Sequence, residues 1–168
     1  MTTSRPRPVT PARSAGGVLF RNRRGVSAGR SVRCHAVGMD PIDTVRRYAE
    51  AWKANDIATV LAMYHEDFVL HYFGESPLAG DHVGRDAAIS ALMEATSRSR
   101  RQLDAIEDVL GGDTFAAIIA REGLGEPVRV VRRLFVYTVR DRMLAECWVY
   151  DEDQRLIDRL WSSPRGAT

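Results

Sequence analysis

The chain of 168 residues is long enough for one domain, or for one domain with a tail, and its 45% hydrophobic residues suffice for a packed core. The net charge of +2 hides an uneven distribution, because residues 1–38 contain eight arginines and no acidic residue. Residues 39–168 contain 16 basic and 22 acidic residues, a net charge of −6, which argues against broad nucleic-acid binding by this part.

Residues 1–38 are rich in proline, serine, glycine and arginine, and this composition predicts a disordered basic extension. The absence of acidic residues is also typical of organelle targeting segments. A third interpretation places the initiator at Met39, since Asp40-Pro41 directly after it is a good helix start, and the extension is then not translated. A nucleic-acid-binding arm is disfavoured by the near absence of aromatic residues. We therefore separate an extension, residues 1–38, from a domain, residues 39–168.

The sequence indicates no metal, cofactor or membrane segment. Cys34 and Cys147 form no C-x-x-C pair, and the four histidines lack the spacing of metal ligands, so we expect a reduced, cytoplasmic protein without metal or cofactor. The longest apolar run near the start, residues 17–20, is too short for a secretory segment. No run approaches the roughly 18 apolar residues of a membrane span.

Three helices are predicted in the first half of the domain, each beginning at an aspartate that can accept from free backbone N–H groups: Asp40, Asp56 and Asp86. Apolar residues recur at helical spacing behind each aspartate, and the stripe of the first helix includes Tyr48 and Trp52. The basic run at 98–101 follows the third helix and is interpreted as its solvated end.

The stretch from Asp67 to Asp86 joins the helical half of the domain to its second half. It begins as a strand in which His71 and Tyr72 point to opposite faces, and it continues as a loop of turn-forming residues. It therefore places an ionisable histidine at the junction where we expect a pocket.

Four further strands are predicted at 102–110, 114–122, 128–139 and 143–150, joined by short turns. Arg133 and Tyr137 share one face of the third of these strands, and Glu146 and Trp148 share one face of the fourth. The last apolar segment, 156–161, fits either a helical turn or a strand. Helices followed by an antiparallel meander indicate an α+β fold, with helices on one face of a curved sheet that encloses a pocket.

Three stretches resemble the SnoaL-like branch of the nuclear-transport-factor-2-like superfamily: RRYAEAWKANDIATVLAMYHEDFVL, SPLAG followed by GRDA, and ECWVYDEDQRLIDRLW. That superfamily includes ketosteroid isomerases, polyketide cyclases, limonene epoxide hydrolase and proteins without known activity. The resemblance covers about residues 40–163. It implies a cone-shaped α+β fold, in which about three N-terminal helices pack on a curved, mostly antiparallel sheet around an apolar pocket, and it implies a homodimer packed sheet to sheet. Since this fold hosts catalysts, carriers and scaffolds, it specifies no reaction.

The chain resembles the ketosteroid isomerases at Tyr48, which stands at the position of their oxyanion-binding tyrosine. Tyr72 stands at the position of their catalytic aspartate, with His71 before it, and their second oxyanion acid falls near Arg133. The tyrosine is kept and both acids are lost, which puts the isomerases' carboxylate proton shuttle in doubt.

The candidate catalytic residues are Tyr48 as a donor to an oxyanion, His71 as a general acid or base, and Glu146 or Asp158 as a carboxylate. Arg133 is a candidate for holding an anionic substrate group. The full set of candidate substrate-binding residues is Tyr72, Arg133, Trp52, Trp148 and Tyr137.

Each candidate also has a structural interpretation. His71 is equally a hydrogen-bonded structural histidine, Tyr48 a core residue, and Arg133 with Glu146 a cross-strand ion pair. The tryptophans are equally packing residues, and Asp158 a helix cap or an ion-pair partner.

Three functions remain open. The first is a cofactor-free isomerase or cyclase that transfers protons on a small apolar carbonyl compound, with His71, Tyr48 and a carboxylate converging in a pocket. The second is a non-catalytic protein that binds a small apolar ligand in the same pocket. The third is a dimeric interaction module whose own aromatic side chains fill the pocket. A further alternative is an epoxide hydrolase, in which Glu146 and Asp158 surround Arg133 and a water.

Overall fold

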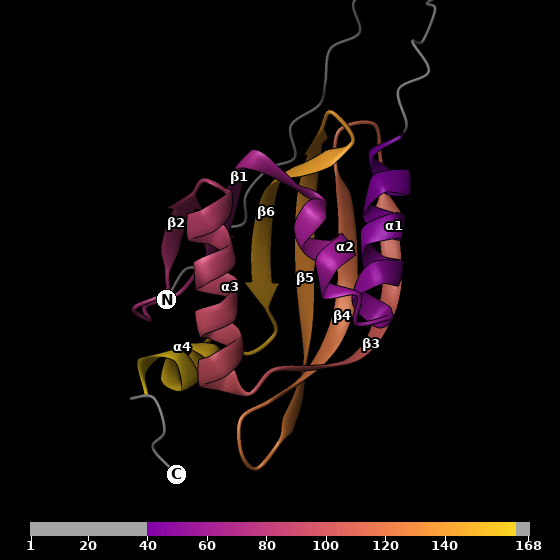
Figure 1. The fold of residues 1–168 in the computed structure, drawn as a ribbon. Coiled ribbons are helices and arrows are strands. Elements are labelled where there is room, and N and C mark those ends of the chain that lie inside the picture. Colours follow the sequence, from indigo (N-terminus) through magenta and orange to yellow (C-terminus); the bar gives the residue numbers. More distant parts are fainter. Residues whose placement is uncertain (1–39, 164–168) are drawn as a thin grey trace, which may run out of the picture. The chain divides into compact units, whose positions relative to one another are not determined.

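The fold combines four helices with a six-stranded sheet in a computed structural model that describes residues 40–163 (Figure 1). The predicted extension, residues 1–38, lies outside these residues. In chain order the elements are α1 (Pro41–Lys53), α2 (Ile57–Ala62), β1 (Tyr64–Tyr72), β2 (Gly80–Val83), α3 (Arg85–Ser99), β3 (Gln102–Gly111), β4 (Ala116–Leu124), β5 (Arg129–Arg140), β6 (Met143–Asp151) and α4 (Gln154–Ser162).

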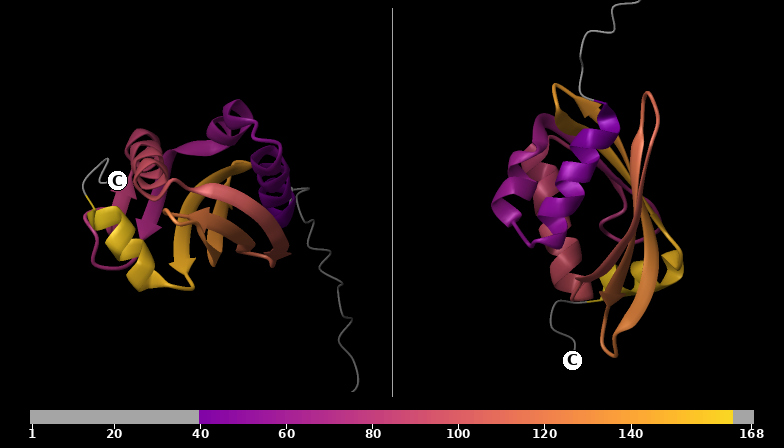
Figure 2. Two further views of the ribbon diagram at one scale, coloured as in Figure 1. Left: turned by 90° about the horizontal axis from the view of Figure 1, so that it is seen from below. Right: turned by 90° about the vertical axis from the view of Figure 1, so that its right-hand side faces the viewer.

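The sheet has the strand order β2-β1-β6-β5-β4-β3. The neighbours β1 and β6 run parallel, and the other four pairs are antiparallel. Helices α1, α2 and α3 lie on one face of this sheet (Figure 2). The predicted α+β class, with helices packed on a mostly antiparallel sheet, is confirmed.

The helix starts agree with the sequence in two of three cases. Asp40 accepts from the N–H of Ile42 at 3.2 Å, and Asp56 accepts from the N–H of Thr59 at 3.1 Å, so both predicted caps are confirmed. The predicted cap at Asp86 is wrong, because α3 begins at Arg85 and its cap position is Gly84, with φ +92° and no side chain that could accept a hydrogen bond. Asp86 lies in the first turn instead, where its negative charge interacts favourably with the positive end of the helix dipole.

Two elements differ from the sequence prediction or complete it. The predicted loop contains the short strand β2, because residues 80–83 pair antiparallel with residues 69–72 of β1. The last apolar segment is the helix α4, which begins after Asp153, whose carboxylate accepts from the N–H of Leu156. Among the helices between residues 40 and 163, none has the length and apolar character that a membrane crossing needs.

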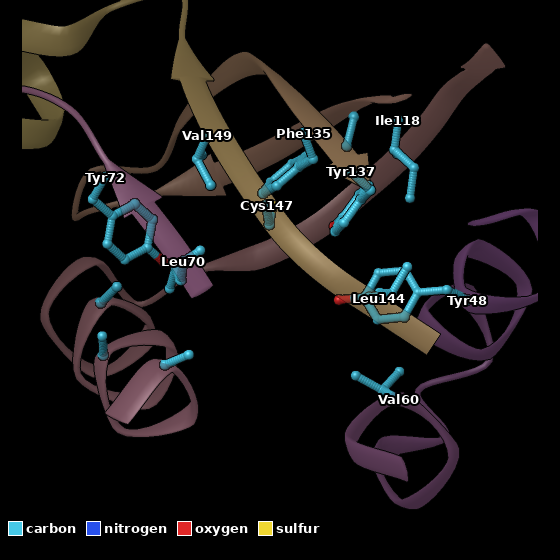
Figure 3. Packing of buried hydrophobic residues seen from close by; sticks show 14 of the residues in the cluster. Tyr48, Val60, Leu70, Tyr72, Ile118, Phe135, Tyr137, Leu144, Cys147 and Val149 are labelled. Carbon is cyan, nitrogen blue, oxygen red and sulfur yellow. The ribbon is translucent and has the colours of Figure 1, made fainter. Parts of the chain in front are cut away.

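Alternation along the strands decides which side chains face the helices. The inner-face residues of β1, β5 and β6 are buried and occupy alternate positions: Phe68, Leu70, Tyr72, Phe135, Tyr137, Cys147 and Val149. Tyr48 of α1 and Val60 of α2 pack with them in one hydrophobic cluster (Figure 3). Residues 71, 146 and 148 lie at the intervening positions and therefore on the outer face.

The close approach of α1 to the end of β3 yields a first prediction. A Cβ atom at Gly111 would lie 2.5 Å from Cβ of Ile42, so Gly111→Ala must push α1 away. We expect a loss of about 1–3 kcal/mol in the free energy of unfolding, typical of overpacking, measured by urea denaturation. Gly112→Ala is the matched control, because no atom lies within 4 Å of its added Cβ. Equal effects of the two substitutions would contradict the packing account.

Candidate functional site

A cavity of about 720 Å³ lies between the inner face of the sheet and helices α1, α2 and α3. Its aromatic lining residues are Tyr48, Trp52, Tyr64, Phe68, Phe135 and Tyr137, and its aliphatic ones are Ile57, Val60, Leu61, Leu70, Leu92, Leu103 and Val149, with Met93 and Cys147 beside them. The charged lining residues are Lys53 and Arg101, and no aspartate, glutamate or histidine is found among the described residues that line the cavity. The volume is that of a site for a drug-sized molecule.

The aromatic wall carries three phenol hydroxyl groups. The hydroxyl oxygens of Tyr48 and Tyr64 are hydrogen-bonded at 2.7 Å, and the ring of Tyr137 lies 5.6 Å from that of Tyr48. Burial raises the pKa of Tyr48 to about 12, against a smaller opposing effect of its bond to Tyr64. Burial likewise raises the pKa values of Tyr64 and Tyr137 well above 10. All three are therefore neutral donors at physiological pH.

The mouth of the cavity has apolar side chains on its rim. Ile57 at the start of α2 and Met93 on the surface of α3 both line the cavity, and they are 51% and 68% exposed. Apolar groups at the rim of a hydrophobic cavity give an apolar ligand a continuous path from solvent.

Arg101 contributes a guanidinium to the cavity wall, just after α3 ends. Its side chain is 16% exposed, and its Nε lies 3.6 Å from Oε1 of the fully buried Glu122. The guanidinium carbon lies 5.9 Å from the ring centroid of Trp52. Burial lowers the pKa of Arg101, but Glu122, Tyr72 and Tyr48 together raise it by more, so the net shift is upward and the residue stays a cation.

Behind Arg101, a second arginine lies buried between two carboxylates. Arg133 donates from Nη1 to Oε2 of Glu122 at 2.9 Å, and it donates from Nε and Nη2 to the two oxygens of Asp151, the latter bond being 3.2 Å long. The three side chains are at most 3% exposed. Burial alone would lower the pKa of Arg133, and the two carboxylates raise it instead. Arg133 therefore pairs with Glu122 and Asp151, and the predicted cross-strand pair with Glu146 is wrong, because Arg133 and Glu146 point to opposite faces.

The structure brings three of the sequence candidates together at the cavity: Tyr48, Trp52 and Tyr137. Arg133 and Tyr72 are buried on the same inner face but do not belong to the cavity lining. Tyr72 packs instead against Trp161 of α4, with ring centroids 4.6 Å apart.

Three other candidates lie together on the outer face of the sheet. The ring of His71 stacks on Trp148 at 4.8 Å, its Nδ1 lies 2.7 Å from Oδ1 of Asp81, and its Nε2 lies 3.6 Å from Oε2 of Glu146. The convergence of His71, Tyr48 and a carboxylate that the proton-transfer hypothesis requires is therefore not found among the described residues. The homodimer implied by the resemblance stays a prediction.

The remaining candidate, Asp158, lies on α4 and holds the loop after β1. Its Oδ1 accepts from the N–H of Glu75 at 3.0 Å and from the amide of Gln154 at 3.2 Å. Gln154 also donates to the carbonyl of Phe73 at 2.9 Å. These bonds fix the loop and leave Asp158 outside the cavity lining.

Sequence reasoning missed Arg101, Cys147 and Glu122 at or beside the cavity. Arg101 belongs to the basic run interpreted as a solvated helix end, and Glu122 is the last residue of a predicted strand. Nothing local distinguishes these two charges from surface charges, because their partners are distant in sequence: Trp52 and Glu122 for Arg101, and Arg133 for Glu122. Within residues 40–163, no three His, Cys, Asp or Glu side chains gather in the way that a metal ion requires.

Comparison with known proteins identifies the family of the domain. The sequence profile of the SnoaL-like domain matches residues 45–147, more than half of the chain. The chain belongs to the SnoaL-like family. No protein of curated function matches the SnoaL-like chain significantly.

Solved structures share the fold of this SnoaL-like domain. Bal32a, from a soil-derived mobile gene cassette, is 23% identical, and the match covers 71% of this chain and 94% of Bal32a with a TM-score of 0.62. A protein of unknown function with a cystatin-like fold, from Xanthomonas campestris, is 19% identical over 74% of this chain and 100% of its own, with a TM-score of 0.67. A candidate SnoaL-like polyketide cyclase from Jannaschia sp. CCS1 is 15% identical over 74% of this chain and 92% of its own, with a TM-score of 0.58. At these identities the likeness shows the fold alone.

The raised pKa of Tyr72 predicts a loss of stability in alkali. Burial raises this pKa to about 12 from 10.0, against smaller opposing effects of Arg101 and Arg133. The folded state keeps a proton that the unfolded state releases, so this contribution to stability is complete below pH 10 and is lost as the pH rises towards 12. Tyr72→Phe removes the group, and the decline in the free energy of unfolding between pH 10 and pH 12 should be smaller by about 2–3 kcal/mol.

The measurement is the urea midpoint of both proteins at a series of pH values from 8 to 12. At pH 8 the two proteins should be similar, since the Tyr72 hydroxyl has no hydrogen-bond partner among the described residues. If the urea midpoints of the two proteins declined equally with pH, the raised pKa of Tyr72 would be contradicted.

The buried charge group yields a third prediction. Asp151→Ala leaves Arg133 with a single carboxylate partner in a buried site, and we expect a loss of about 3–5 kcal/mol in the free energy of unfolding. Asp104→Ala is the control, because its ion pair with Arg121 is half exposed and contributes little. The measurement is thermal or urea unfolding of both variants. A similar loss of stability in Asp151→Ala and Asp104→Ala would show that burial of the ion pair does not determine its contribution.

Proposed function

We propose that this SnoaL-like domain binds a small apolar molecule in the cavity and does not convert it. The observation that carries the proposal is the lining itself: an open space of about 720 Å³ with apolar and aromatic walls and, among the described residues, no histidine or carboxylate facing it. An open cavity speaks against the interaction module whose own aromatic side chains fill the pocket. Hydrophobic walls with a few fixed polar groups are typical of ligand sites.

A proton-transfer enzyme is less well supported by the same geometry. Tyr48 and Tyr64 offer neutral donors of the kind that stabilise an oxyanion. A base must also lie within hydrogen-bond reach of the substrate proton, and the candidate bases His71 and Glu146 lie on the outer face. The donors alone fit recognition of a ligand oxygen.

An epoxide hydrolase has one specific observation in its favour, since Arg133 does lie between two carboxylates, though these are Glu122 and Asp151. The group lies behind the wall of the cavity and not on it. Both oxygens of Asp151 and one of Glu122 are occupied by Arg133, which leaves little capacity to hold and activate a water. We therefore prefer ligand binding.

The proposal predicts that filling the cavity abolishes binding of a neutral apolar probe. The full chain should bind N-phenyl-1-naphthylamine with increased probe fluorescence, and Leu92→Trp should remove most of this signal, because residue 92 lines the cavity and the larger indole fills it. Native mass spectrometry of the same preparation gives the mass of any co-purified ligand.

Val83→Trp is the matched control, since Val83 is 71% exposed and lies outside the cavity lining. It should bind the probe like the unmodified protein. Absence of probe binding to the unmodified chain, or equal binding by both tryptophan variants, would overturn the proposal.

A further inference from the structure

We infer that the ligand of the cavity carries a carboxylate group and that Arg101 is the residue that binds it. This inference rests on the binding function proposed above and adds the chemical class of the ligand.

The first step concerns the hydrogen-bond donors of Arg101. An arginine side chain has five N–H donors in a planar fork. Within residues 40–163, the Arg101 guanidinium makes no hydrogen bond, although the side chain is only 16% exposed. Its backbone N–H is bound, donating to the carbonyl of Thr96 at 3.2 Å. A nearly buried guanidinium with unfilled donors is costly unless a ligand or solvent fills them.

The second step concerns what holds Arg101 at the wall. Its two neighbours, Glu122 at 3.6 Å and the Trp52 ring at 5.9 Å, attract the charge without taking a hydrogen bond. Glu122 accepts a hydrogen bond from Arg133 at Oε2, and its Oε1 has no hydrogen-bond partner among the described residues. The guanidinium is thus positioned by charge and stacking while its fork stays open, so a ligand breaks no hydrogen bond when it binds.

The third step compares Arg101 with the other polar groups of the cavity. Lys53 is 45% exposed and donates to Glu50 at 2.9 Å, so its charge is already paired at the surface. The hydroxyl groups of Tyr48 and Tyr64 are bonded to each other. Of the two cations in the described lining, Arg101 is therefore the one whose side chain makes no hydrogen bond within the described residues.

The fourth step is the match of shape. A carboxylate accepts two parallel N–H bonds from an arginine fork, and such charge-assisted pairs are stronger than neutral hydrogen bonds. Trp52 and Leu103 line the cavity beside Arg101 and offer apolar surface to the rest of the ligand. An apolar acid satisfies both the fork and the walls.

The test compares two ligands of the same shape, 2-naphthoate and 2-naphthamide, as competitors of N-phenyl-1-naphthylamine on the full chain. The acid, charged at pH 7, should bind roughly tenfold more tightly than the amide, the order of magnitude of one charge-assisted hydrogen bond. In Arg101→Gln the acid should lose this advantage, while the amide and the fluorescent probe bind as before.

Lys53→Gln is the control, because it removes the other cation of the cavity and should leave the preference for the acid intact. Equal affinities for acid and amide in the unmodified protein would overturn the inference while the proposed binding function stands. A preference that survives Arg101→Gln would overturn it as well. Loss of probe, acid and amide binding altogether from the unmodified chain would overturn both proposals.

Discussion

The buried Arg133 guanidinium is the constraint on which the end of the cavity depends. It joins β4 through Glu122 and β6 through Asp151, and its carbon lies 5.8 Å from the ring of Trp161 on α4. Three strands and the last helix therefore meet at one charge. The same Glu122 also attracts Arg101. Negative and positive side chains therefore alternate from Asp151 in the core to Arg101 at the cavity wall. Because each charge is compensated by its neighbour, the group is tolerable in a buried site.

The aromatic side chains that line the cavity pack against one another. The ring centroid of Tyr48 lies 5.8 Å from that of Tyr64 and 6.2 Å from that of Trp52. The rings of Trp52 and Phe135 pack edge to face, with centroids 5.3 Å apart. These rings form a rigid wall on the side of α1. On the other side, α3 buries small residues, Ala88, Ala91 and Ala95, while its larger Leu92 borders the cavity. The space between these two walls is available to a ligand.

Strand positions and shared faces were predictable from alternation, but the side that faces the helices was not. In β6, Glu146 and Trp148 alternate with Cys147 and Val149, and both sets contain large or apolar residues. The outer face exposes Phe115 and Tyr150 as well, so hydrophobicity does not separate the two faces. Because of this ambiguity the sequence predicts His71 in the pocket, and the pairing of β1 with β6 places it on the outer face. The buried Arg133 was beyond local reasoning for the opposite reason, since its partners come from two other strands.

The groups around the cavity decide what it can do to a ligand. Tyr72, which the resemblance aligns with the catalytic aspartate of ketosteroid isomerases, is kept protonated by burial and packs on Trp161. A neutral phenol held in this way accepts no proton from a substrate. Arg101, the more buried of the two cations that line the cavity, offers hydrogen bonds rather than proton transfer. Neutral donors beside a cation, with no histidine or carboxylate among the described lining residues, are the groups that the proposed recognition of an anion uses.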